Sequence, residues 1–341
     1  MIQGSIWNKD LETLFYGYFK KNIYSCDLIS SHGSDRIIIR IKSDDKTTAI
    51  GIINKHLEEN KAFLEFAGNF LSHKLKVPKI YGISDDLTCY LMEDLGDLTL
   101  YDYRKKKDPQ KKKIGKEVLE YYKQAIIDLQ KFQVEAAKTI NYGLCYQFNE
   151  FAAKNIEYDL NYFKTRFLKN FYKEKLEANK LETDLKFLKS KLLEIPREYF
   201  LYRDFQSRNI MIKKGKLYYI DFQSGRKGAL QYDLASLLFD AKANIPQNKR
   251  EFLLDYYVKN LKKKYKIDTS NFKEYFWYFT IIRILQAMGA YGYLGIAKGK
   301  KKFLESVPYA LKNINMLLKE KIDKNSMTYL RKIFIELLEQ I

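Results

Sequence analysis

The sequence predicts an α+β fold in which a small β-rich front part precedes a large, mostly helical back part. Short apolar runs separated by turn residues crowd the first 92 positions, whereas helical periodicity dominates after position 98. With 341 residues, 46% of them hydrophobic, the chain is long enough to bury a substantial core. We therefore expect two domains, an N-terminal lobe at 1–95 and a C-terminal lobe at 96–341.

The front part is expected to contain two helices, at 9–21 and 55–72, whose apolar residues recur at helical spacing. Its β-like runs lie at 23–30, 36–42, 47–53, 80–83 and 88–92. Ser, Gly and Asp separate the first three runs, so these runs predict an antiparallel meander.

The back part is expected to be helical apart from a β segment at 199–221. The expected helices lie at 98–107, 115–139, 148–174, 180–194, 230–242, 247–264, 271–288, 299–320 and 326–340.

The formal net charge of +19 raises the question of nucleic-acid binding. Lys alternates with Asp and Glu along the expected helices, which is typical of solvated helix faces. The sequence contains no RNA-binding motif and no zinc finger. Nucleic acid is therefore not expected as a partner.

Cellular location follows from two further patterns. The three cysteines are widely spaced and form no C-x-x-C pair, which argues against a disulfide framework and against structural zinc. The first residues form no signal peptide, and no stretch reaches about 18 uninterrupted apolar residues. We expect a cytoplasmic protein that does not cross a membrane.

The chemistry is concentrated in the segment 201–223. Apolar runs at 210–212 and 217–220 flank a Lys-Lys-Gly-Lys turn and predict a hairpin. Asn209 precedes the first strand and Asp221 follows the second, so both lie at the open end, where neighbouring strands are about 5 Å apart. An amide oxygen and a carboxylate facing one space suit Mg²⁺.

Asp204 lies five residues before Asn209, in the loop that leads into the hairpin. Phosphoryl transfer needs two metal ligands and one carboxylate that orients and deprotonates the acceptor hydroxyl. The alternative is that Asp204, Asn209 and Asp221 are ordinary turn residues. Their spacing around one hairpin favours the catalytic interpretation.

Two motifs in this segment resemble a known superfamily. Residues 202–209, Tyr-Arg-Asp-Phe-Gln-Ser-Arg-Asn, resemble the H-x-D-x-x-x-x-N catalytic loop of aminoglycoside phosphotransferases, choline kinases and protein kinases. Residues 220–223, Ile-Asp-Phe-Gln, resemble the metal-binding D-F-G motif. The resemblance implies a bilobal protein-kinase-like fold with ATP and Mg²⁺ as cofactors. It also implies that Asp204 is the catalytic base and that Asn209 and Asp221 hold the metal.

The resemblance narrows to one subgroup. Residues 231–238, Gln-Tyr-Asp-Leu-Ala-Ser-Leu-Leu, and the stretches 283–292 and 92–96 are similar to the anomeric N-acetylmuramate/N-acetylglucosamine kinases of cell-wall recycling. This implies an amino-sugar acceptor, with the anomeric hydroxyl as a candidate position. An aminoglycoside or choline-type kinase is the alternative within the class, and a catalytically idle nucleotide-binding pseudokinase is the alternative outside it.

Two departures from the superfamily pattern motivate the idle alternative. Tyr202 stands where the catalytic loop usually has a His of largely scaffolding role. The third strand lacks the lysine that a V-A-I-K strand would place at the phosphates. Lys55 or Arg40 could replace it, with Glu59 pairing with one of them.

The front part also supplies candidate nucleotide contacts. The turn at 31–35 stands where a phosphate-covering loop belongs, so Ser31, Gly33 and Ser34 are candidates for backbone contacts to phosphate, with an ordinary hairpin turn as the alternative. Position between the lobes suggests that Met92, Glu93 and Asp94 offer backbone hydrogen bonds to adenine. We expect Asp233 to cap the helix that it begins.

Arg203 and Arg208 flank the expected base. Each could stabilise charge on the transferring phosphoryl group, and each could equally form an internal ion pair. The acceptor pocket is expected in the C-terminal lobe, lined by Gln223, Arg226, Arg283 and Gln286. The implied reaction is direct in-line transfer from ATP to the acceptor hydroxyl.

Overall fold

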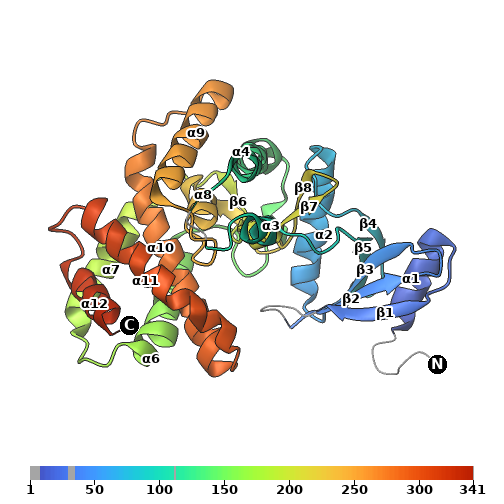
Figure 1. Ribbon diagram of the computed structural model, residues 1–341, viewed down its shortest axis with the longest axis horizontal. Helices are drawn as coiled ribbons and strands as arrows, with labels where there is room; N and C mark the ends of the chain where they lie inside the picture. The colour runs from blue at the N-terminus through green and yellow to red at the C-terminus, as the bar shows by residue number, and fades with distance from the viewer. Residues whose placement is uncertain (1–7, 30–34, 111–112, 341) are drawn as a thin grey trace.

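A computed structural model describes residues 8–29, 35–110 and 113–340. A sheet with one helix on its outer side lies at one end of the molecule, and a large helical body lies at the other (Figure 1). The α+β, bilobal, protein-kinase-like fold expected from the sequence is confirmed.

The N-lobe sheet has five antiparallel strands, β1 (Ser25–Ile29), β2 (Ile37–Lys42), β3 (Thr48–Ile53), β4 (Ile80–Ile83) and β5 (Cys89–Glu93). They are arranged in the order β1-β2-β3-β5-β4, so the meander predicted for the first three strands is confirmed. In this order β5 lies beside β3, with Ala49 opposite Glu93. The chain therefore leaves the sheet from an inner strand and enters the C-lobe directly.

Two helices cover the sheet, α1 (Lys9–Phe19) and α2 (Leu57–Ser72). Phe15 of α1 packs with Ile39 and Ile41 in one buried cluster, whereas Phe63 of α2 packs with Ile50 in another. Because successive strand residues point to opposite faces, a strand that is apolar at most positions can serve both helices. The sheet is buried on two sides, and α2 is the helix that faces the C-lobe (Figure 1).

The C-lobe contains the remaining helices, α3 (Leu100–Lys107), α4 (Lys116–Gln130), α5 (Ala153–Tyr162), α6 (Lys169–Phe171), α7 (Ala178–Leu193), α8 (Gln231–Leu238), α9 (Gln247–Tyr265), α10 (Phe272–Gly292), α11 (Val307–Glu320) and α12 (Thr328–Glu339). Its strands form two pairs, β6 (Tyr199–Leu201) with β9 (Arg226–Gly228) and β7 (Ile210–Lys213) with β8 (Lys216–Tyr219). Helix α10 runs through the centre and contacts α5, α7, α8 and α11.

Some expected helices are less regular than the periodicity indicated. The helix expected at 148–174 begins only at Ala153 and continues through a π-helical turn at Phe163–Leu168. The helix expected at 299–320 starts as a 3₁₀ turn and becomes α-helical at Val307, just before Pro308. Proline has no N–H to donate, so it is tolerated in the first helical turn.

Aromatic residues join the two lobes. Phe63 of α2 stacks on Phe222 of the C-lobe, with ring centroids 4.7 Å apart, and Phe70 packs edge-on against Phe200 at 5.3 Å.

Among the described residues, no helix is long and apolar enough to cross a membrane. The domain boundary at 95/96 stays a prediction; it falls in the stretch between the end of β5 and the start of α3 at Leu100.

Candidate active site

The expected hairpin is confirmed as β7 and β8, in which Ile210 pairs with Tyr219 and Lys213 with Lys216. Lys214 and Gly215 between the strands both have positive φ, 50° and 71°. This conformation matches the right-handed twist of the strands and closes a two-residue turn. The open end of the ribbon is therefore fixed by local geometry.

Three polar residues converge at that open end. The Asn209 side chain donates from Nδ2 to the backbone oxygen of Asp204, 2.9 Å away, and to Oδ2 of Asp221, 3.3 Å away. Asn209 is 9% exposed, whereas the side chains of Asp204 and Asp221 are each 33% exposed. The amide thus links the loop carrying Asp204 to the carboxylate of Asp221, and both carboxylates remain open to solvent.

Asp221 has a left-handed backbone, with φ of 68°. Such a conformation costs about 1–3 kcal/mol in a residue other than glycine and persists only where neighbours hold it. On one side, Tyr202 donates its hydroxyl to the backbone oxygen of Ile220 over 2.8 Å. On the other side, Phe222 stacks on Phe63. Tyr202 therefore ties the loop that carries Asp204 to the loop that carries Asp221.

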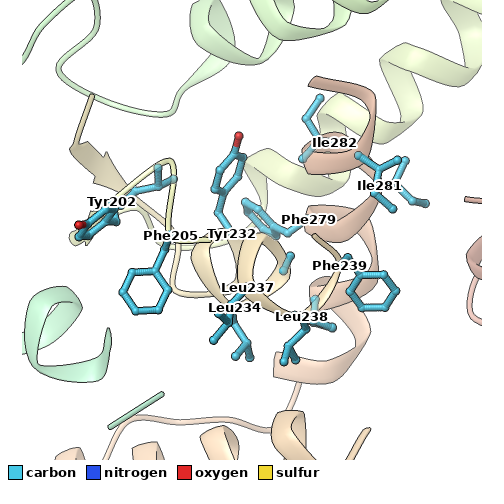
Figure 2. Close-up of a cluster of buried hydrophobic side chains, with 14 of the residues drawn as sticks. Tyr202, Phe205, Tyr232, Leu234, Leu237, Leu238, Phe239, Phe279, Ile281 and Ile282 are labelled. Atoms are coloured by element: carbon cyan, nitrogen blue, oxygen red, sulfur yellow. The ribbon is translucent and has the colours of Figure 1, made fainter. Parts of the chain in front are cut away.

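Helix α8 holds the backbone of the loop that begins at Tyr202. Both oxygens of the buried Asp233 carboxylate accept backbone N–H bonds, from Tyr202 at 2.7 Å and Arg203 at 2.9 Å. The expectation that Asp233 caps its own helix is wrong, because its carboxylate accepts from the backbone of Tyr202 and Arg203 instead. Burial raises the pKa of Asp233 to about 7, against the lowering effect of the two N–H donors. Figure 2 shows Tyr202 and Phe205 of the loop beside the apolar residues of α8.

Arg203 matches the internal ion-pair alternative. Its guanidinium binds both oxygens of Asp159 at 2.7 and 2.8 Å, and the Asp159 side chain is only 1% exposed. The cation also lies over the rings of Phe151 and Tyr232. Buried and fully engaged, this arginine anchors the loop to α5.

Arg208, the second flanking arginine, is exposed. It lies near enough to Asp221 to help lower the pKa of that carboxyl group. Its contact with a phosphoryl group stays a prediction.

Helix α10 carries two of the expected acceptor residues, Arg283 and Gln286, and brings Arg283 to Asp204. The Arg283 guanidinium lies 3.5 Å from an Asp204 carboxylate oxygen and is held by hydrogen bonds to Ser236 (3.0 Å) and Gln286 (2.7 Å). Arg283 is 5% exposed, and Gln286 is half-buried. A fixed cation therefore lies beside the candidate base, and the Gln286 amide helps to hold that cation.

The other two expected acceptor residues have internal partners. Gln223 donates from Nε2 to Asp221 over 3.0 Å, so it lies at the metal-binding carboxylate. Arg226 is 2% exposed and donates to the backbone oxygen of Ser224 and the side chain of Asn155. Burial and the nearby Arg203 cation lower the pKa of Arg226 to about 10. Both side chains brace the loop after Asp221.

The N-lobe contributes a residue that sequence reasoning missed. Arg36, at the entrance to β2, donates to Asp221 Oδ1 over 2.8 Å, and its Nε lies 3.8 Å from Glu59 of α2. The expectation that Glu59 pairs with Lys55 or Arg40 is wrong. Lys55 is exposed at the end of β3, and Arg40 pairs elsewhere. A cation directly after the turn predicted at 31–35 is the signal that could have indicated Arg36.

Arg36 changes the electrostatics of the metal-binding carboxylate. Burial alone would raise the pKa of Asp221, but the Arg36 cation and the hydrogen bond from Gln223 outweigh it, and the net pKa is lowered. Asp221 is therefore ionised at neutral pH and able to act as a ligand.

The segment between the lobes is firmly braced. Arg40 forms a two-point ion pair with Asp94, at 2.8 and 3.0 Å, and Lys213 of the hairpin donates to Glu93 and to the backbone oxygen of Asp94. The backbone N–H of Glu93 donates to the backbone oxygen of Lys79 over 2.8 Å. Adenine contact by Met92, Glu93 and Asp94 stays a prediction. Ser31, Gly33 and Ser34 lie outside the described residues.

The donor set fits a magnesium ion. Asn209 has its nitrogen committed to the protein, which leaves the amide oxygen as its ligand atom, and Asp221 adds a carboxylate. No group of three or more His, Cys, Asp or Glu in 8–29, 35–110 and 113–340 could hold a metal by itself. Mg²⁺ characteristically binds one or two carboxylates together with substrate phosphates and water, so this sparse set suits it.

Sequence comparisons identify a family and a relative. The family model described as "Phosphotransferase enzyme family" (APH) matches residues 40–268. An N-acetylmuramate/N-acetylglucosamine kinase from Neisseria meningitidis serogroup B is 31% identical over 123 residues, which cover 34% of this chain and 36% of that relative.

Solved structures share the fold at low sequence identity. A Plasmodium vivax ethanolamine kinase superposes with a TM-score of 0.64 at 12% identity, covering 94% of each chain. A spectinomycin phosphotransferase in complex with ADP and spectinomycin gives 0.58 at 12% identity, covering 99% of this chain and all of that one.

Proposed function

Because the chain belongs to the APH phosphotransferase family, we propose that it transfers the γ-phosphoryl group of ATP, with Mg²⁺, to a hydroxyl of an amino sugar. N-acetylmuramate and N-acetylglucosamine are the acceptors to test first, at the anomeric hydroxyl. The partial match to the meningococcal sugar kinase supports this acceptor class.

One observation carries the proposal. Asp204, Asn209 and Asp221 are tied together at the open end of one hairpin, with Asn209 bonded to both of the others. An ion bound between Asn209 and Asp221 would neutralise charge on the nucleotide phosphates. Asp204, on the loop just before, would accept the proton of the acceptor hydroxyl.

The protein's own part in the reaction is positioning. The Asp204 backbone is fixed by hydrogen bonds from Asn209 and from the N–H of Gln206, so its carboxylate has a defined place. Holding the acceptor hydroxyl near the transferring group removes much of the entropic cost of the step. Phosphoryl transfer of this kind proceeds directly and in line, without a phosphoenzyme.

The acceptor side is polar. Arg283 lies 3.5 Å from Asp204 and donates to Gln286, so the two side chains provide donors and acceptors suited to sugar hydroxyl or amide groups. We propose that these two residues contact the sugar, because Arg283 lies beside Asp204 and holds the half-buried Gln286. An alanine variant of Gln286 with unchanged acceptor affinity would remove it from the pocket.

The test is an acceptor panel. The protein is incubated with ATP and Mg²⁺ and with N-acetylmuramate, N-acetylglucosamine, choline or an aminoglycoside, and products are identified by phosphorus NMR. We expect a sugar phosphate that requires Mg²⁺ and is lost in Asp204→Asn. A product formed from choline or the aminoglycoside alone would overturn the acceptor class. Consumption of none of the four acceptors would favour an idle nucleotide-binding role.

A further inference from the structure

Strand β3 has no cation to offer to a bound nucleotide. Its residues, Thr-Ala-Ile-Gly-Ile-Ile, are all uncharged, and four of the six positions are buried. The exposed Lys55 follows this strand, but Glu59 of α2 pairs with Arg36, the residue before β2, and not with Lys55. A site that takes a triphosphate still needs fixed positive charge from this lobe.

That charge is present one strand away. Arg36 directly precedes β2, and only 12% of its side chain is exposed. It reaches Asp221, 185 positions further along the chain, at 2.8 Å and lies 3.8 Å from Glu59. The cation therefore lies where the sheet, α2 and the metal-binding loop meet.

Aromatic packing fixes this meeting point. Tyr90 of β5 stacks on Phe63 of α2 at 5.1 Å, and Phe63 stacks on Phe222, the residue after Asp221, at 4.7 Å. The Tyr90 hydroxyl is buried beside the Arg36 cation, which acts to lower its otherwise raised pKa. One aromatic stack thus spans both lobes next to the ion pairs. We infer that this stack fixes the position of Arg36 relative to Asp221.

The net charge of this cluster favours binding of a metal cation first and of phosphate afterwards. Arg36 carries +1 against −1 each from Glu59 and Asp221, so the cluster has a net charge of −1. A divalent ion reverses the sign to +1, which favours a polyanion. A guanidinium has five N–H donors in a planar fork, so it can bind carboxylate and phosphate oxygens together.

We propose that Arg36 binds the phosphates of the nucleotide in place of the absent strand lysine, with Glu59 as the residue that positions it. This rests on the proposed function. Phosphate binding by a β3 lysine is thereby replaced by phosphate binding from Arg36, the residue before β2. In place of a lysine–glutamate ion pair, this arginine bridges Glu59 and Asp221.

The test is nucleotide binding, measured by calorimetry on the full chain without any acceptor. The variants are Arg36→Met and Arg36→Lys, with Lys42→Met as the matched control. Lys42 is a cation at the far end of the same strand and pairs with Asp27 at 2.7 Å on the surface. Thermal melts check that each variant is folded.

We expect Arg36→Met to weaken MgADP binding by roughly 10–100-fold, the loss typical of a charge-assisted contact. Adenosine has no phosphate, so its affinity should stay within about twofold. Arg36→Lys keeps the charge but not the guanidinium fork, so it should recover only part of the MgADP affinity. Lys42→Met should bind like wild type. If Arg36→Met fails to fold, Glu59→Gln tests the same contact, with a smaller loss expected for MgADP and none for adenosine.

Unchanged MgADP affinity in Arg36→Met would overturn the inference, and so would an equal loss for adenosine, which would indicate a merely structural role. A loss in Lys55→Met instead would assign the phosphates to that residue. The proposed function fails separately: in that case wild type shows no Mg²⁺-dependent binding of ADP. If wild type binds MgADP and Asp221→Asn does not, while Arg36→Met binds normally, the proposed function stands and the inference alone is wrong.

Discussion

The two halves of the candidate site are assembled over very different chain distances. Asp204, Asn209 and Asp221 lie within one loop and hairpin of the C-lobe, whereas Arg36 reaches the same carboxylate from the N-lobe across 185 positions. The C-lobe half is assembled by its own turn and by α8, and the N-lobe meets it at Asp221 and Phe222. The N-lobe half exists only when the lobes are packed as they are here. Damage to the first should impair chemistry, and damage to the second should impair nucleotide binding.

The strongest way to break the C-lobe half is Asp204→Asn. Removing a general base typically costs about 10²–10⁴-fold in rate. Because Asp204 contributes its backbone oxygen, not its carboxylate, to the bond with Asn209, the metal ligands should keep their places and MgADP affinity should stay near wild type. Turnover with the identified acceptor measures the first effect and calorimetry the second. A variant that keeps more than a tenth of the wild-type rate would contradict the assignment of the base.

A second change tests the helix that carries Arg283. A Cβ at Gly292 of α10 would lie 1.9 Å from the backbone oxygen of Arg166, so Gly292→Ala must displace backbone. We expect a loss of roughly 1–3 kcal/mol in the free energy of unfolding, measured by denaturant titration.

The matched control is Gly68→Ala in α2 of the N-lobe. This glycine is exposed, and a Cβ there would meet nothing within 4 Å. Alanine should stabilise that helix by about 0.5–1 kcal/mol, so the two substitutions should have opposite signs. Equal stability of the two variants would show that α10 is not tightly packed at this crossing.

A smaller effect distinguishes support of the loop from chemistry. Tyr202→Phe removes one buried hydrogen bond to Ile220 and leaves the ring in place. We expect about 1 kcal/mol less stability, or roughly a fivefold shift in any equilibrium that depends on the loop. The exposed Tyr24→Phe serves as the control. A loss of activity as large as that of Asp204→Asn would mean that Tyr202 takes part in the reaction itself.

The smallest expected effect concerns the ion pair between Arg40 and Asp94, which holds the segment that leads from one lobe to the other. Burial alone would raise the pKa of Asp94, but hydrogen bonds from Arg40 and the Gly96 N–H outweigh it and lower the net pKa below 3.8. A lowered carboxyl pKa gives stability that is present above about pH 4 and is lost as the pH falls through the folded-state pKa. Asp94→Asn should therefore melt lower than wild type by a constant margin from pH 8 to 5, equivalent to about 1 kcal/mol or less. That margin should shrink below pH 4; a margin that widens on acidification would refute the pairing.

The sequence was sufficient for the C-lobe half because its geometry is local. A Lys-Lys-Gly-Lys turn between two apolar runs dictates a hairpin, and a hairpin dictates that Asn209 and Asp221 meet. The same holds for the strands of the front part, each of which was located to within about two residues. Helix ends were harder to locate, since π-helical and 3₁₀ turns preserve much of the apolar periodicity.

The remaining features depend on contacts between distant positions, which no local pattern encodes. Arg203 could be a phosphate ligand or an ion-pair partner until Asp159, 44 positions away, is seen to hold it. Asp233 resembles a helix cap, and only the fold brings it under the catalytic loop. Arg36 and Arg40 are four positions apart, and only the contacts of the folded chain show that Arg36 reaches Glu59 and Asp221 whereas Arg40 pairs with Asp94.

The most direct test of the central claim is a titration of Mn²⁺, as a spectroscopic substitute for Mg²⁺, followed by electron paramagnetic resonance in the presence of ADP. We predict one nucleotide-dependent site that is lost in Asn209→Ala and in Asp221→Asn and retained in Asp204→Asn, since only the first two residues would be ligands. Equal retention of the site in all three variants would contradict the account, because the hairpin would then not hold the metal.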